Sequence, residues 1–260
     1  MEQKILLNTL GIQLSFWVYW LVFCGIIMGR YFVTAGGAHW LLHLVLGEQL
    51  QHSWFGDRQQ VQHAISEDIK LSTLSAIFFA LSAACFMGCY QLGITRVYTQ
   101  LSLQDLAYVV VSYIGILVLQ DTYFYFMHRL LHLPLLFKHF HQGHHQSKTL
   151  TPWTSFAFDP LEAVLQAAFL LCIAVVVPLH YGVLIALLTT MTIWAVGNHI
   201  GLQVVPESRF SRWWGGWCIG SAHHLIHHNR YSLHYGLYFT FWDKVLGTYD
   251  AKYEAKRSQH

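Results

Sequence analysis

Hydrophobic positions along this chain gather into long continuous runs rather than into short alternating stretches. Three runs, residues 10–29, 71–93 and 106–126, are each close to the roughly 20 residues that a helix needs to cross the hydrocarbon core of a bilayer. The third run is apolar until Gln120 and Asp121 appear near its end. The pattern predicts an all-α integral membrane protein in which each of these runs is a transmembrane helix, the first being a retained anchor.

A fourth apolar segment, residues 163–198, is interrupted by Pro178 and Gly182. Each of its two arms has about 15 residues, which is short for a full crossing. The segment therefore predicts either a re-entrant helical hairpin or two short, tilted crossings. Both alternatives return the chain to the side from which the segment starts.

The distribution of positive charge predicts how these helices are oriented in the membrane. All Lys and Arg residues except Lys4 and Arg96 lie in residues 30–70 or from residue 129 onward. Because positive loops remain on the cytoplasmic side, a 30–70 loop and the C-terminal half are predicted to be cytoplasmic. The formal net charge of +2 is too small to indicate nucleic acid as a partner.

Histidine is the residue type that carries the chemistry. The chain has 18 histidines, and most of those in residues 128–145 and 223–234 fall into three boxes, HRLLH, HQGHH and HLIHH. Residues three or four apart share one face of a helix, so each box directs its imidazoles toward one place. Eight imidazoles exceed the four ligands of a tetrahedral zinc ion and indicate two metal ions in a cytoplasmic, histidine-rich helical cap. The eight candidate ligands are His128, His132, His141, His144, His145, His224, His227 and His228.

Two further residues are candidates for the same site. Asp121 lies on one helical stripe with His128 and His132, and a carboxylate near the end of a membrane helix needs a partner. We expect it to accept a hydrogen bond from the free ring nitrogen of a ligating histidine, the alternative being that it faces water. His199 follows the interrupted apolar segment and is expected to reach the site as a ninth ligand.

The boxes also carry a family resemblance. DTYFYFMHRLLH, HQGHH and HHLIHH, followed by GLYFTFWDKVLGTY at 236–249, resemble the fatty acid hydroxylase / sterol desaturase superfamily of membrane-bound enzymes with an eight-histidine di-iron centre. The stretch TPWTSFAFDPLEAVLQ is most similar to the sterol C-5 desaturase-like branch, although Asp159 stands where many members have histidine. The resemblance implies that the eight box histidines bind two iron ions and that O2 is a co-substrate.

What the resemblance implies about function is hydroxylation of a lipid, either a sterol or a fatty acyl chain, with desaturation of the same lipid class as the alternative. A histidine-based membrane metal transporter is the competing interpretation from another class. The resemblance also divides the chain into N-terminal membrane helices (1–105), a catalytic region (106–250) and a polar C-terminal tail (251–260).

Electrons for such a reaction need another protein. The sequence has no GxGxxG and no CxxC cluster, so a separate donor, cytochrome b5 or ferredoxin with a reductase, is implied. Arg209 and Arg212 are candidates for its docking surface. The expected location is a bacterial inner membrane or the endoplasmic reticulum, with the active site on the cytoplasmic side.

Overall fold

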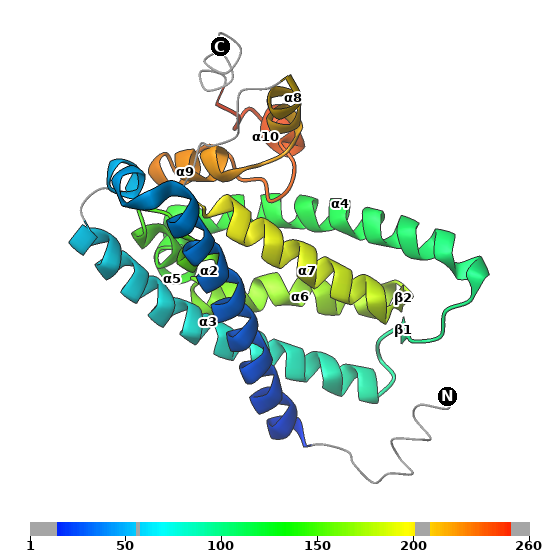
Figure 1. Cartoon of the computed structure of the whole chain (residues 1–260). Helices are drawn as coiled ribbons and strands as arrows, with labels where there is room; N and C mark the ends of the chain where they lie inside the picture. The colour runs from blue at the N-terminus through cyan, green and yellow to red at the C-terminus, as the bar shows by residue number, and fades with distance from the viewer. Residues whose placement is uncertain (1–14, 56–57, 201–208, 251–260) are drawn as a thin grey trace.

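Long helices make up most of the chain. The structure is a computed structural model that describes residues 15–55, 58–200 and 209–250. Its longest elements, α2 (Phe16–Phe55) and α3 (Arg58–Gln91), run antiparallel along one side of the molecule (Figure 1). The predicted all-α membrane fold is confirmed, because four of the described helices are long and apolar enough to cross a bilayer. The proposed tail, 251–260, lies outside the described residues.

Residues 30–70 were expected to form a loop, but residues 30–55 and 58–70 are helical and continue α2 and α3, and the sequence 30–70 contains no proline. At 1.5 Å per residue the 40 residues of α2 span about 60 Å, roughly twice the thickness of the hydrocarbon core. The two helices meet through small side chains, with Ala35 packed in a core that also contains Ala76 and Ala80.

The segment 163–198 is a helical hairpin. It comprises α6 (Pro160–Val176) and α7 (Tyr181–Asn198), and the break falls at Pro178, while Gly182 lies inside the first turn of α7. Between the helices, β2 (Leu179–His180) pairs in parallel with β1 (Val97–Tyr98), which precedes a 3-10 turn, η1 (Leu103–Asp105). Only α7 of the two has the length of a membrane span.

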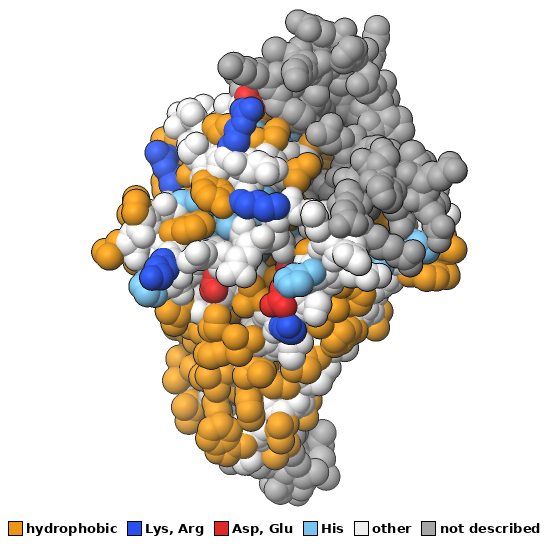
Figure 2. Space-filling model, turned by 90° about the vertical axis from the view of Figure 1, so that its left-hand side faces the viewer, with side chains coloured by type: hydrophobic (Ala, Val, Ile, Leu, Met, Phe, Trp, Pro, Cys, Tyr) orange, Lys and Arg blue, Asp and Glu red, His pale blue; other side chains and the backbone are white. Residues whose placement is uncertain are grey.

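The direction of each helix brings the polar segments to one end of the bundle. The helix α4 (Leu106–Leu131) and α7 end where α6 begins, close to α5 (Pro134–Phe140) and α9 (Ser221–Asn229) (Figure 1). The remaining helices α8 (Arg209–Trp217) and α10 (Phe241–Val245) lie above α9, whereas β1 and β2 lie at the far end of α4 and α7. On the face shown in Figure 2, the charged and histidine side chains gather over the upper part, and a hydrophobic surface covers the part below.

This arrangement predicts that the two ends of the bundle lie on opposite sides of the membrane. With the five native cysteines replaced, a cysteine at Gln142 and one at Gln100 should react with an impermeant maleimide from opposite sides of sealed vesicles. Both positions are exposed, so accessibility does not bias the comparison. Labelling of both from the same side would contradict the arrangement.

Candidate metal centre

Nine histidines from four segments of the chain meet at one end of the bundle. His128 and His132 lie at the end of α4, and the HQGHH box follows α5 and includes the short 3-10 turn η2 (His144–Gln146). His199 caps the C-terminus of α7, and the third box lies on α9. These four segments come together because each of them lies at the same end of the bundle.

The nine imidazoles form two groups, and within each group the nearest ring nitrogens lie within 4.8 Å of one another. The five-histidine group consists of His128, His132, His141, His145 and His227. The four-histidine group consists of His144, His199, His224 and His228. The groups are adjacent, since the ring centroids of His145 and His228 are 4.5 Å apart. All nine candidate ligands are thus brought together, including His199.

Backbone carbonyls hold most of these rings in one tautomer. A carbonyl oxygen only accepts, so a ring nitrogen beside it must be the N–H donor, which leaves a lone pair on the other nitrogen. In five rings Nδ1 lies 2.7–3.1 Å from a backbone oxygen. The acceptors of His128, His144, His199, His227 and His228 are respectively Tyr235, Ala157, Ala195, Leu233 and Ser147.

The Nε2 atoms of two of these rings face each other without a proton between them. In the four-histidine group, Nε2 of His228 lies 3.1 Å from Nε2 of His144, and Nδ1 is the donor in both rings. Two lone pairs cannot form a hydrogen bond, and a cation bound to both nitrogens would remove their repulsion. Nitrogens bound to one ion at about 2.0–2.1 Å lie about 3–3.4 Å apart, which matches the observed spacing. These residues therefore fit a pair of metal ions.

Burial keeps the imidazoles neutral, as metal binding requires. Removal from water lowers the pKa of His144 to about 4, and burial together with the neighbouring His144 lowers the pKa of His132 and of His199 to about 3. The pKa values of His224, His227 and His228 are also held well below the ordinary value, first by burial and then by neighbouring histidines. Near neutral pH every one of these rings offers a lone pair.

A buried carboxylate holds one ligand, and it is not the carboxylate expected from the sequence. Glu162, in the first turn of α6, is fully buried, and its Oε2 lies 2.7 Å from Nδ1 of His141. Its other oxygen accepts from the side-chain amide of Gln166 at 3.1 Å. A carboxylate behind a ligating histidine fixes the ring orientation and raises its basicity. In the sequence, Glu162 could have been recognised as a candidate because it is a carboxylate at the start of an apolar helix.

Asp121 was expected to accept from a ligating histidine, and this prediction is wrong. Its Oδ1 accepts from the backbone N–H groups of residues 237–239, at 3.2, 2.7 and 3.1 Å. The alternative of a water-facing carboxylate is also wrong, because Asp121 is buried. Seven residues separate it from His128, about 10 Å along the helix, and at that level the neighbour is the loop before α10.

That loop carries two of the carbonyls that hold the site. Asp243 accepts from the backbone N–H groups of Tyr235 and Gly236 at 2.8 and 3.0 Å, while Asp121 fixes the following three residues. A side chain at Gly236 would place Cβ 2.4 Å from the carbonyl oxygen of Phe239, so only glycine fits there. The oxygens of Leu233 and Tyr235 are thereby positioned for His227 and His128.

A fourth buried carboxylate connects α3 with the centre. Asp68 is buried and accepts from the hydroxyls of Ser147 and of Thr154, the latter at 2.6 Å. The carbonyl of Ser147 in turn accepts from Nδ1 of His228. The turn η3 (Pro152–Phe156) is held on α2 as well, because Tyr31 donates to the carbonyl of Trp153 at 2.9 Å. The membrane helices thus fix the segment that follows the second histidine box.

Other histidines lie outside both groups. His223 and His234 pack against each other with ring centroids 4.9 Å apart, and the ring of Tyr249 lies 5.0 Å from that of His234. His180 caps α7, where Nδ1 accepts from the backbone N–H of Gly182. Asp159 accepts from the N–H of Gly143 inside the second box at 2.7 Å.

Comparison with known proteins assigns this arrangement to a family. The family model for fatty acid hydroxylases matches residues 113–248, which is more than half of the chain and includes all three histidine boxes. The chain belongs to the fatty acid hydroxylase family. The resemblance of the boxes to this superfamily is therefore confirmed. No solved structure matches the chain.

Several curated relatives carry sterol names. Lathosterol oxidase of Rattus norvegicus is 30% identical over 200 residues, covering 76% of this chain and 65% of the relative. Lathosterol oxidase of Homo sapiens is 36% identical over 140 residues, covering 54% and 45%. A Delta(7)-sterol 5(6)-desaturase of Eremothecium gossypii is 26% identical over 226 residues, covering 81% and 60%. These names confirm the likeness to the sterol C-5 desaturase-like branch, and the chain spans less than two thirds of each relative.

The pairing of Glu162 with His141 predicts a weaker metal site after Glu162→Gln. An amide cannot accept with a full charge, so metal affinity should fall by about 10–100-fold. Titration of the apoprotein with Fe²⁺ under anaerobic conditions measures this change. Glu67→Gln is the matched control, because Glu67 is exposed and pairs with Lys70. Equal affinities of the two variants would contradict a role of Glu162 in holding the ligand.

Proposed function

We propose that this protein is a membrane-bound, O2-dependent oxidoreductase that holds two iron ions and desaturates a sterol-type lipid. The observation that carries the proposal is the pair of histidine groups, in which unprotonated ring nitrogens converge within a buried site. Imidazole ligands suit zinc, copper, iron and nickel, and membership of the fatty acid hydroxylase family favours iron among these metals. The names of the relatives favour desaturation over the hydroxylation that was expected from the sequence.

The residues of the two groups would hold one ion each. When bound, the iron ions supply the reductive activation of O2. The carbonyls of Ala157, Ala195 and Ser147 keep three imidazoles of the four-histidine group in the ligating tautomer, and Glu162 does so for His141. The burial of eight of the nine rings limits the access of water to the site and so limits side reactions.

The overall reaction consumes two electrons from outside the chain. Desaturation removes two hydrogen atoms from adjacent carbons, and with O2, two electrons and two protons it produces two molecules of water. Hydroxylation with the same inputs inserts one oxygen atom and releases one molecule of water. A separate donor, cytochrome b5 or ferredoxin with a reductase, belongs to the proposal. The side chains of Arg209 and Arg212, suggested for its docking, lie outside the described residues.

We propose that the protein crosses the membrane several times and that the metal centre lies on the cytoplasmic side. Lys138, Lys148 and Arg230 lie at the same end of the bundle as the histidines, and Arg96 lies beside β1 at the other end. Positive residues favour the cytoplasmic side of a membrane. Both a bacterial inner membrane and the endoplasmic reticulum meet this requirement.

The proposal predicts conversion of a Δ7-sterol to a product with two hydrogens fewer. Purified protein in lipid vesicles, supplied with iron, O2 and a reductase chain, is incubated with the sterol, and the lipids are analysed by mass spectrometry. His227→Ala should abolish the product because it removes a member of the five-histidine group. His63→Ala should leave it unchanged because His63 is exposed on α3.

Other outcomes would replace the proposal. A product that gains one oxygen atom would establish a hydroxylase. Identical lipids with the wild type and with His227→Ala would refute a lipid oxidoreductase, and metal uptake into vesicles would then test the transporter interpretation. Transport is disfavoured by the position of the histidines at helix ends, since transporter ligands lie near the bilayer midplane.

A further inference from the structure

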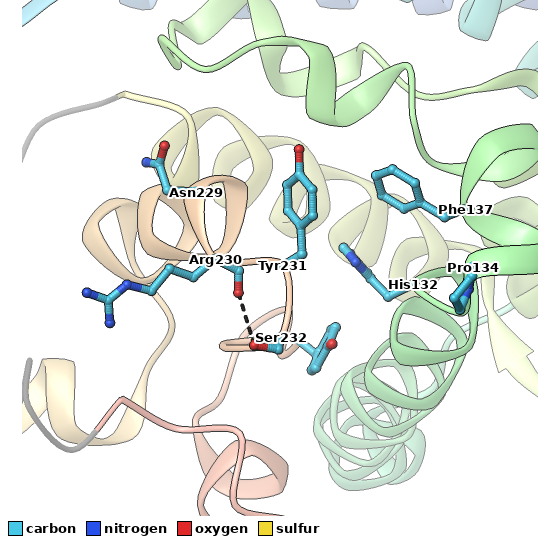
Figure 3. A pocket seen from close by; sticks show the side chains of 8 residues that line it. His132, Pro134, Phe137, Asn229, Arg230, Tyr231 and Ser232 are labelled. Atoms are coloured by element: carbon cyan, nitrogen blue, oxygen red, sulfur yellow. Dashed lines mark hydrogen bonds between the residues drawn. The ribbon is translucent and has the colours of Figure 1, made fainter.

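A cleft of about 690 Å³ opens directly beside the five-histidine group. One wall comes from the junction of α4 and α5, where His132, Pro134 and Phe137 line it, and the other comes from the segment that follows α9 (Figure 3). Its size falls within the roughly 300–1,000 Å³ range of small-molecule sites. The cleft is therefore large enough for a lipid fragment and touches the metal centre.

The cleft is in contact with the five-histidine group through His132, and its lining contains no member of the four-histidine group. His132 is half-buried and lines the cleft, whereas the other eight histidines are buried. The ring of His132 is in turn close to the rest of its group, with Nε2 3.1 Å from Nε2 of His227. The five-histidine group is thus open on one side, and the four-histidine group is enclosed. A substrate in the cleft would reach the ion of the five-histidine group first.

Aromatic rings form the walls next to the histidines. Tyr235 lies 5.2 Å from His132 between ring centroids, and Phe137 lies 5.4 Å from it. Tyr231 lies 5.4 Å from Phe137 and 4.6 Å from His145, so it covers the inner end of the cleft. Lys148 fixes this tyrosine, since its Nζ lies 2.6 Å from the phenol oxygen and 3.0 Å from the carbonyl of His228. The walls next to the histidines are therefore aromatic.

The two edges of the cleft differ in chemistry. Asn229, Arg230 and Ser232 lie on one side of the cleft (Figure 3). The side chains of Asn229 and Arg230 donate to Leu225 and Asp250, and the exposed hydroxyl of Ser232 donates to the carbonyl of Arg230 and can accept a hydrogen bond from a ligand. Pro134 lies on the other side, between Leu133 and Leu135, whose side chains are 51% and 82% exposed. Exposed leucines beside an opening form an apolar surface that can lie at the bilayer. A molecule that is mostly apolar but has one polar group would therefore match both edges.

We infer that this cleft binds the fused-ring end of a hydroxylated sterol and presents it to the five-histidine group. The rings lie between Phe137, Tyr231 and Tyr235, the hydroxyl lies at the edge formed by residues 229–232, and the exposed leucines provide access from the bilayer. A rigid ring system loses little conformational entropy between such walls, whereas a flexible acyl chain loses more. The inference rests on the proposed function and adds the place and orientation of the substrate.

Photo-crosslinking tests the inference without requiring turnover. The iron-loaded protein in vesicles is irradiated with a hydroxylated sterol that carries a diazirine in its ring system, and the labelled peptides are identified by mass spectrometry. Labels should fall on the peptides that contain Phe137 and Tyr231–Tyr235. Labels confined to the lipid-facing surfaces of α2, α3 and α4 would overturn the inference.

A blocking substitution provides the second measurement. Ser232→Trp places a large ring in the mouth of the cleft at an exposed position, so the fold and the iron content should be unchanged. It should reduce both labelling and sterol turnover by about tenfold or more. Ser66→Trp, exposed on α3 and absent from the cleft, is the matched control. Full labelling and turnover by Ser232→Trp would refute the cleft while leaving the proposed function intact. Labelling in the cleft with no sterol product would refute the proposed function alone.

Discussion

Ring nitrogens of buried histidines that face one another at about 3 Å are the contacts on which the rest of this structure depends, and in the pair of His144 and His228 both nitrogens carry lone pairs. Such contacts repel unless a cation lies between them, and burial makes protonation of the rings unfavourable. Metal binding would therefore add to the free energy that holds the helix ends together. The bundle is arranged to satisfy this requirement, since four of its segments bring their histidines to one end.

Carboxylates and carbonyls around the histidines fix the orientation of the imidazole rings. Glu162 acts directly on a ring, whereas Asp68, Asp121 and Asp243 act on the backbone or side chains that hold other rings. Each of these four carboxylates is buried, and each accepts at least two hydrogen bonds, which offsets the cost of removing it from water. The WDKVLGT motif acquires a physical role in this way, because its aspartate fixes the loop whose carbonyls hold His128 and His227.

Some of these features were predictable from the sequence, and others depend on tertiary contacts. Periodic spacing correctly indicated helices at the first and third histidine boxes, and the break at Pro178 correctly indicated a hairpin. The second box is instead a turn followed by η2, and the second and third boxes each divide their histidines between the two groups. The partition into five and four histidines was not predictable, because His144 and His145 are adjacent in sequence and yet belong to different groups. Spacing along one helix suggested Asp121 as a partner for histidine, whereas the partner comes from α6, a segment brought close only by the fold. Charge indicated a loop at 30–70, but charged residues are equally compatible with helices that extend beyond the bilayer.

Metal stoichiometry combined with Mössbauer spectroscopy tests the central claim most directly. Protein purified with ⁵⁷Fe, without added chelator, should contain two iron ions per chain. Its spectrum should show high-spin iron in two nitrogen-rich environments, one for each histidine group. His199→Ala should change the spectrum of one environment and leave the other. A single ion per chain, or two zinc ions that iron does not replace, would contradict the account.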